Sequence, residues 1–345
     1  MRLQEDDMKD DMKDDERVSV SRRGFLKGVA VGGASMLLPG TVRASRQGNA
    51  LASLHDLSKC IGCGECVSAC SEQNGGKYPD PQKPFPKMYP GRVKVADWSD
   101  RRDVQERLTP YNWLTIQTVE VDWQGQSYEI NIPRRCMHCQ NPPCANLCPW
   151  GACAREDNGV VRINTDICLG GSKCKSVCPW DIPERQTGVG LYLKLLPAFA
   201  GNGVMYKCDR CFELLADGRV PACVSECPEE VQFIGPRQDI LVRAHALAKT
   251  FAGDADENDF IYGEHENGGT NTIYVSPVPI PLLAKALETG PGSPHMDPVK
   301  DMMAQDEFLG LAALAAPLAG VAAGLLTAGA KFIKSGKKDE EATHE

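Results

Sequence analysis

Aromatic side chains and catalytic motifs are scarce in this sequence of 345 residues. Phe, Trp and Tyr make up 6% of it, against 33 Gly and 24 Pro, which indicates a loop-rich fold without a large aromatic core. No nucleophile–base pair, phosphate-binding loop or dinucleotide fingerprint is recognisable. No Cys-x-x-Cys-His segment occurs, which argues against covalently bound c-type haem. The sequence therefore predicts a chain that performs no substrate chemistry of its own.

The charge gives no sign of a nucleic-acid partner. The net charge is −8, and residues 1–44 contribute nothing to it because they hold eight basic and eight acidic residues. No basic stripe with interleaved aromatic residues is present, so nucleic-acid binding is not expected. An acidic balance of this size more often reflects solubility than the choice of a partner.

Cysteine, in contrast, is abundant: fifteen of the 16 cysteines fall into four short groups, and Cys153 stands just outside them. Three closely spaced cysteines can wrap three irons of a cubane cluster, while a fourth, often followed by Pro, completes a different cluster. Four such groups predict several iron–sulfur clusters. The groups are Cys60, Cys63, Cys66 and Cys70; Cys136, Cys139, Cys144 and Cys148; Cys168, Cys174 and Cys178; and Cys208, Cys211, Cys223 and Cys227.

Disulfides and zinc are the competing interpretations of these cysteines. Disulfide scaffolds are mostly small, and the close spacing of Cys60, Cys63 and Cys66 suits one polynuclear centre better than several bridges. Zinc fits the fourth group alone, because Cys-x2-Cys followed by Cys-x3-Cys resembles a ribbon. It does not explain the first and second groups.

The N-terminal 44 residues are predicted to be an export signal. Arg22-Arg23 is followed by Phe25-Leu26-Lys27, then by the apolar run 28–38 and a Val-x-Ala cleavage site at 42–44. The run is too short and Gly-rich to span a bilayer. The element resembles a twin-arginine signal, which exports folded proteins, as clusters inserted in the cytoplasm require. A plain N-terminal helix is the alternative.

The C-terminal region predicts a single membrane anchor. Residues 308–330 are a run of 23 uncharged residues, long enough to cross the hydrocarbon core as a helix. Four lysines follow between positions 331 and 338, which places the tail, 331–345, in the cytoplasm and the body on the periplasmic face. Residues 282–307 are then a linker. A buried Ala-rich helix of a soluble domain is the alternative for the run.

The body, residues 51–281, is predicted to have an α+β fold. Alternating apolar residues at 113–121 and 127–132, on either side of Gly125, predict a β-hairpin. Residues 160–163 and 231–234, each downstream of a Cys-Pro pair, predict short strands. Residues 236–252 predict a helix, with its apolar face on Ile240, Leu241, Ala244 and Leu247.

The order of the four groups, the twin arginines, the C-terminal span and two short segments resemble the four-cluster ferredoxin-type electron-transfer subunits of membrane oxidoreductases. The segments are Tyr262-Gly263-Glu264 and Gly268-Gly269-Thr270. The likeness covers roughly residues 22–335 and is greatest to the exported subunits of uptake hydrogenases and high-molecular-weight cytochrome complexes. The formate dehydrogenase beta subunit is similar apart from the leader. The resemblance implies two pseudo-symmetric bacterial-ferredoxin-like halves with inserts, and clusters in a line.

The resemblance also implies how the groups combine, which spacing alone leaves open. The first group pairs with the fourth, and the second with the third. Carried over, the first site is Cys60, Cys63, Cys66 and Cys227; the second Cys208, Cys211, Cys223 and Cys70; the third Cys136, Cys139, Cys144 and Cys178; and the fourth Cys148, Cys168 and Cys174.

The fourth site is incomplete because Gly171 stands where the third group should have its second cysteine. Glycine cannot ligate iron. Nitrate reductase beta subunits, with a tryptophan there, carry a three-iron cluster, so we expect [3Fe-4S] here and [4Fe-4S] at the other three sites. Two alternatives stay open: Cys153 replaces the missing ligand, or a four-iron cluster carries water or hydroxide on its open iron. Packing of Cys153 as a small apolar residue is favoured over ligation.

Four residues beside the cysteines have weaker claims. His138 is expected to donate to a cluster sulfur, to contact a partner or simply to pack near a cluster. Lys207 either raises a nearby potential or lies on the surface. Trp150 and Trp180, each following a Cys-Pro pair, are predicted to shield clusters by packing.

Together these features predict a non-catalytic electron-transfer subunit. It would pass electrons between a catalytic subunit or a multihaem cytochrome and a polytopic, quinone-reactive membrane subunit. The alternative from another class is a free-standing redox enzyme that uses the open iron of the incomplete site. A third possibility is a non-redox scaffold stapled by metal.

Overall fold

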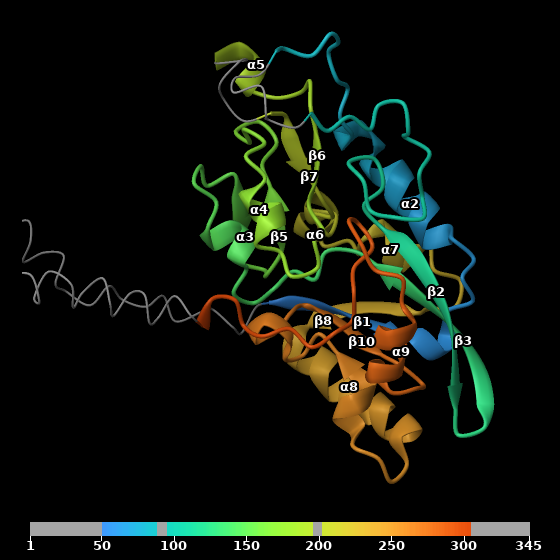
Figure 1. The fold of residues 1–345 in the computed structure, drawn as a ribbon. Helices are drawn as coiled ribbons and strands as arrows, with labels where there is room; N and C mark the ends of the chain where they lie inside the picture. Colours follow the sequence, from blue (N-terminus) through green and yellow to red (C-terminus); the bar gives the residue numbers. More distant parts are fainter. Residues whose placement is uncertain (1–49, 88–94, 196–201, 305–345) are drawn as a thin grey trace, which may run out of the picture. The chain divides into compact units, whose positions relative to one another are not determined.

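The computed structural model describes residues 50–87, 95–195 and 202–304, which form a mixed α/β body (Figure 1). The predicted signal region, membrane span and cytoplasmic tail, residues 1–44, 308–330 and 331–345, lie outside these ranges. Within them, no helix has both the length and the apolar character needed to cross a membrane.

A four-stranded sheet joins segments from both ends of the body. Its strands lie in the order β8 (Gln232–Pro236), β1 (Leu51–Asp56), β10 (Thr272–Val275) and β9 (Ile261–Tyr262). Strand β1 pairs antiparallel with β8 and parallel with β10, and β9 is antiparallel to β10. Leu54 is therefore flanked by Phe233 on one side and Ile273 on the other.

The two faces of this sheet bury different residues because successive side chains alternate along each strand. On one face, Ala52 and Leu54 pack with Ile240, Ala244 and Ala248 of helix α8 (Arg237–Ala252), which covers the sheet in Figure 1. Burial at every fourth residue gives α8 its single apolar stripe. The opposite face turns toward the cysteine-bearing segments. It carries the polar and aromatic side chains of Ser53, His55, Thr272 and Tyr274.

Three two-stranded ribbons complete the strands of the described chain. They are β2 (Thr115–Trp123) with β3 (Gln126–Arg134), β4 (Cys153–Arg155) with β5 (Val161–Ile163), and β6 (Glu184–Gln186) with β7 (Val204–Tyr206). The first is the predicted hairpin: Gln124 and Gly125 both have positive φ, the geometry of a two-residue turn that matches strand twist. The predicted strands at 160–163 and 231–234 and the helix at 236–252 are also confirmed within two residues.

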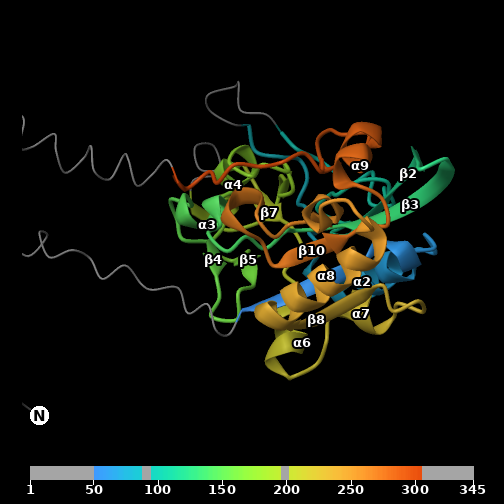
Figure 2. The same cartoon turned by 90° about the horizontal axis from the view of Figure 1, so that it is seen from below.

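Short helices carry one or two cysteines of each group. Helix α2 (Glu65–Asn74) lies beside α7 (Ala222–Ser225), and α3 (Pro143–Asn146) lies beside α4 (Lys173–Ser176) (Figure 2). The other helical segments are α5 (Tyr192–Leu195), α6 (Phe212–Ala216), α9 (Ile280–Ala286), and the 3-10 turns η2 (Leu57–Lys59), η3 (Gly75–Lys77), η4 (Glu257–Phe260) and η5 (Glu266–Gly268). The two helix pairs bring together the groups that the resemblance pairs.

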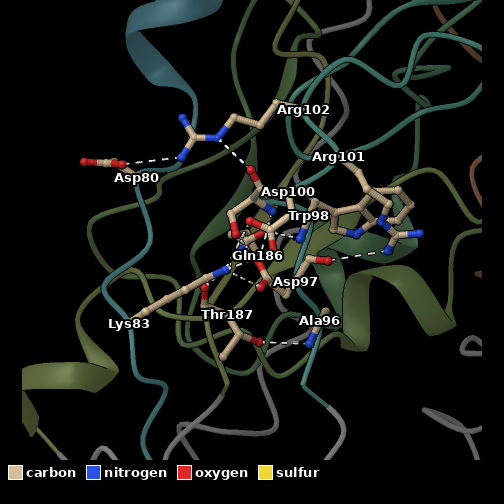
Figure 3. A network of polar contacts seen from close by, with 11 residues as sticks. Asp80, Lys83, Ala96, Asp97, Trp98, Asp100, Arg101, Arg102, Gln186 and Thr187 are labelled. Atoms are coloured by element: carbon tan, nitrogen blue, oxygen red, sulfur yellow. Dashed lines mark hydrogen bonds and ion pairs between the residues drawn. The ribbon is translucent and has the colours of Figure 1, made fainter.

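The insert after the first cysteine group is fixed to β6 by a polar network (Figure 3). The Gln186 side chain accepts from Trp98 N at 2.7 Å and donates to Asp97 Oδ1 at 3.0 Å. Lys83 Nζ forms ion pairs with Asp97 and Asp100 at 3.1 and 3.2 Å. One side chain thus satisfies both an amide and a carboxylate, and it fixes Asp97 and Trp98 against β6.

The described part of the predicted linker, residues 282–304, packs onto the body. Leu283 and Met296 are fully buried. Arg134 Nη2 donates to His295 O at 2.7 Å, and Tyr262 Oη donates to Asp297 O at 3.1 Å. The folded body therefore continues well beyond residue 281.

Candidate metal centres

Four cysteines line a small hollow next to the hairpin. They are Cys60, Cys63, Cys66 and Cys227, the set that the resemblance implied for the first site. Ile61 and Val231 supply apolar walls, and Val231 N donates to Cys227 Sγ at 3.3 Å. The loop from Cys60 to Cys66 curls tightly around the hollow, with Gly62 and Gly64 at positive φ. A Cβ on Gly62 would lie 2.7 Å from the Asn131 side chain, so only glycine fits there without a shift.

A second small hollow is lined by the four cysteines of the third site. They are Cys136, Cys139, Cys144 and Cys178. Pro179 and Trp180 close one wall, while His138 and Lys207 contribute the polar part of the lining. Trp180 is buried, and its Nε1 donates to Tyr262 Oη at 2.7 Å. Its predicted shielding role agrees with this position.

The second site is inferred from two contacts of Asn74 and from the electrostatic effects that its cysteines exert on Cys70. Asn74 Nδ2 lies 3.7 Å from Cys70 Sγ and 3.9 Å from Cys211 Sγ. Burial, and then the charges of Cys208, Cys223 and Cys211, raise the pKa of Cys70 well above its usual value. The structure thus brings together Cys70, Cys208, Cys211 and Cys223.

The three cysteines of the incomplete site also converge. Burial, followed by the charges of Cys168, Cys144 and Cys148, raises the pKa of Cys174 to about 12. Gly171 is exposed, and a Cβ built on it meets no atom within 4 Å. The missing ligand therefore leaves open space at this position rather than a residue packed in its place.

Neighbouring sites influence one another electrostatically in the order first, second, third, fourth. Burial and then the charge of Cys223 raise the pKa of Cys66, which links the first site to the second. Burial raises the pKa of Cys208 most, Arg135 lowers it, and the charge of Cys136 raises it again. The effect of Cys136 links the second site to the third. The charge of Cys144 at Cys174 links the third to the fourth.

The donor set fits iron–sulfur clusters. A cluster binds one thiolate per iron, and N–H donors to its sulfurs tune it. Here Arg210 N donates to Cys208 Sγ at 3.3 Å and Cys153 N to Cys148 Sγ at 3.5 Å. All 16 cysteines are described, and none forms a disulfide. No three potential ligands in the described ranges converge on one point as they would around a single ion.

Cys153 lies between the third and fourth sites. It is 4% exposed and belongs to the apolar core that holds the cluster cysteines. Its thiol hydrogen-bonds to Cys144, which raises the pKa of Cys153, while its backbone N–H donates to Cys148. Cys153 thus contacts one cysteine of each neighbouring site.

The remaining predicted residues differ in their exposure. Trp150 is 60% exposed, so its predicted role as a buried shield is wrong: the turn after α3 points it outward. Lys207 and His138 are buried beside the third site. Val161 anchors both, because its carbonyl accepts from Lys207 Nζ and its N–H donates to His138 Nδ1 at 3.0 Å.

Sequence reasoning missed the polar residues that contact the second site. Asn74 spans two of its sulfurs, and Arg135 Nη1 donates to Cys223 Sγ at 2.7 Å. Arg135 directly precedes Cys136, which is predicted to belong to a different site, so its position in the sequence gave no sign of the contact with Cys223. The only available signal was two consecutive arginines in a segment otherwise made of cluster ligands.

Comparison with known proteins decides the family. Two models described as 4Fe-4S dicluster domains match residues 59–152 and 128–237. The B subunit of sulfite dehydrogenase from Allochromatium vinosum is 30% identical over 196 residues, which cover 55% of this chain and 70% of that protein. The chain belongs to the ferredoxin-type iron–sulfur electron-transfer subunits of oxidoreductase complexes.

Other ferredoxin-type subunits match over longer segments. Hydrogenase-2 operon protein HybA of Escherichia coli O157:H7 is 26% identical over 296 residues, or 75% of this chain and 82% of that protein. The nitrate-inducible formate dehydrogenase iron–sulfur subunit of Escherichia coli K12 is 27% identical over 226 residues, which cover 65% of this chain and 67% of that subunit. The resemblance to hydrogenase and formate dehydrogenase subunits is thereby confirmed, and iron–sulfur clusters are the expected cofactors.

Proposed function

We propose that this subunit conducts electrons along four iron–sulfur clusters, one at each of the four sites, and performs no substrate chemistry itself. The observation that carries the proposal is the arrangement of fifteen cysteines in four sets that follow one another in the order first, second, third, fourth. When bound, the clusters supply one-electron transfer. The chain's part is to hold them in sequence, bury them and donate hydrogen bonds to their sulfurs.

Three sites have four cysteines and take [4Fe-4S] clusters, whereas the fourth takes [3Fe-4S] because Gly171 provides no ligand. Cys153 is not assigned as a ligand, since its thiol contacts Cys144 of the third site. The helix pairs α2–α7 and α3–α4 support the assignment to two pseudo-symmetric ferredoxin-like halves, one holding each pair of sites.

Exposed apolar side chains lie at both ends of the line, as expected for a chain that docks two redox partners. Ile61 sits on the first site and is 62% exposed. Leu147, Trp150 and Ile167 are also exposed, on the segments that carry ligands of the fourth site. These two surfaces fit a catalytic subunit or multihaem cytochrome at one end and a polytopic quinone-reactive membrane subunit at the other.

Export and anchoring belong to the same proposal. The twin arginines of residues 22–23 and the uncharged run 308–330, followed by lysines, support a body on the periplasmic face of the cytoplasmic membrane with a single-pass anchor. Replacing Arg22 and Arg23 together by Lys should leave the protein in the cytoplasm on cell fractionation. An unchanged periplasmic location in that variant would contradict export by this route.

Purification separates the electron-transfer function from its rivals. Anaerobically purified full-length chain should contain about 15 iron and about 16 acid-labile sulfide atoms, the sum for three [4Fe-4S] clusters and one [3Fe-4S] cluster. It should show no substrate turnover until it is combined with its complex. Turnover by the isolated chain would favour a free-standing enzyme, and absence of sulfide would favour a non-redox scaffold.

A further inference from the structure

Four cationic side chains are buried within the body. Arg134, Arg135 and Arg210 are each 1% exposed and Lys207 is 6% exposed. An isolated buried charge is costly, so a partner of opposite charge is expected. None of these four side chains forms an ion pair with a carboxylate in the described part of the chain.

The buried carboxylates are engaged elsewhere. Asp56 accepts hydrogen bonds from Ser58 at the end of β1. Glu184 pairs with Arg107 at 2.9 Å and Lys175 at 2.8 Å on the other side of the body. Cysteine sulfurs are the anionic groups that remain close to the buried cations.

Arg135 contacts a sulfur directly. Its Nη1 donates to Cys223 Sγ at 2.7 Å, and its Nη2 lies 3.0 Å from His55 Nε2. Of these two groups, only the sulfur becomes anionic, when it binds metal, so it is the group that can balance the guanidinium charge. The ring of His55 packs at a tilt against that of Tyr274, with 4.7 Å between the ring centroids, so the face of the sheet opposite α8 holds the guanidinium against the second site.

Lys207 occupies the equivalent position at the third site. It lines the hollow formed by Cys136, Cys139, Cys144 and Cys178. Its Nζ donates to Val161 O, and to Cys208 O at 3.1 Å, which fixes the ammonium between the third and second sites. Both bonds go to neutral carbonyls, so they orient the charge without neutralising it.

We propose that Arg135 and Lys207 are positioning residues that raise the midpoint potentials of the second and third clusters, respectively. This inference rests on the proposed function. A loaded site is a net anion because its thiolates outweigh the charge of the iron–sulfide core, and reduction adds one more negative charge. A fixed cation in a low-dielectric interior therefore stabilises the reduced form more than the oxidised form. Removing the cation should lower the potential of the cluster beside it.

The test is an EPR-monitored redox titration of the purified complex containing the full-length chain. Arg135→Gln and Lys207→Met remove the two charges while keeping most of the side-chain volume. Arg243→Gln and Lys249→Met are the matched controls, because both residues are exposed on α8, away from the cysteines. Each test variant should lower the midpoint of a single four-iron centre, a different one in each case, and neither control should move any.

Iron and sulfide analysis of each variant shows whether its clusters have assembled, so that a changed midpoint is not confused with misfolding. A variant with wild-type iron content and unchanged midpoints would overturn the proposal, as would equal shifts in the controls. If Arg135→Gln does not assemble, Arg135→Lys and Arg135→Met are compared at the same centre. The proposal requires the charge-keeping Lys variant to stay close to the wild-type midpoint, and it fails if the two variants shift that midpoint equally. Low iron in the wild-type chain itself would instead contradict the proposed function.

Discussion

Arg135 Nη1 donates to Cys223 Sγ at 2.7 Å, and both side chains are buried. The contact joins a residue that precedes the second cysteine group to a ligand of the fourth group. A guanidinium can be stable there only if the sulfur side carries negative charge, which a metal-bound thiolate does and a neutral thiol does not. The fold of the body and its metal content are therefore coupled.

Removing iron with a chelator should destabilise the body sharply. Without metal, burial raises the pKa of thiols such as Cys66 to about 12, so they are neutral at pH 7 and the buried cations lose their counter-charge. The free energy of unfolding should fall by roughly 3–5 kcal/mol, as when one partner of a buried ion pair is removed. Circular dichroism on heating measures it, and an apo chain that melts like the loaded one would contradict the coupling.

Gly171→Cys should convert the fourth site to a four-iron cluster. The position has open space around it and no positive φ, so a cysteine can be added without strain. The three-iron EPR signal of the oxidised protein should disappear, and iron should rise by about one atom per chain. The matched control is Gly290→Cys, an exposed position with equally open space far along the chain. A three-iron signal that persists in Gly171→Cys would contradict the assignment of the site.

Cys153→Ala should keep all four clusters. Its thiol packs beside Cys144 and is not needed as a ligand, so the three-iron signal and the iron content should match the wild type. The loss of a small buried side chain should cost about 1 kcal/mol of unfolding free energy. Cys148→Ala is the positive control, since it removes a ligand of the same site. Loss of a four-iron centre in Cys153→Ala would instead show that Cys153 is a ligand.

Ile61→Gln and Trp150→Gln should each impair one partner contact. Both side chains are mostly exposed beside an end cluster, and truncating a central apolar anchor typically costs about 2 kcal/mol or more of binding free energy. Turnover of the complex should fall while the cluster potentials stay constant. Val242→Gln, which changes an equally exposed apolar residue on α8, should have no effect. Unchanged assembly and turnover in both test variants would remove the support for docking at the two ends.

The sequence predicted local elements well where a repeating pattern or a special turn specified them. The β2–β3 hairpin followed from alternation around Gly125, and α8 from apolar residues at helical spacing. Two of the four cysteine sets each line one hollow, in the combinations that the resemblance implied; the full ligand assignment stays a prediction. Spacing alone left that pairing open, because each loop sends its last cysteine to a different site.

What the sequence did not reveal were pairings between distant segments. The parallel pairing of β1 with β10 joins residues more than 200 positions apart, and two short strands carry no signal for each other. Trp150 and Trp180 follow identical Cys-Pro pairs, yet one is exposed and the other buried. The difference arises because Tyr262, far along the chain, provides a hydrogen-bond acceptor for Trp180.

The most direct measurement is an anaerobic reductive titration of the purified full-length chain, with the electrons counted by coulometry and the centres followed by EPR. Four one-electron centres predict an uptake of about four electrons per chain, with one centre of the three-iron type among them. An uptake of about one electron or none, in protein with its full iron content, would contradict a line of four electron-carrying clusters.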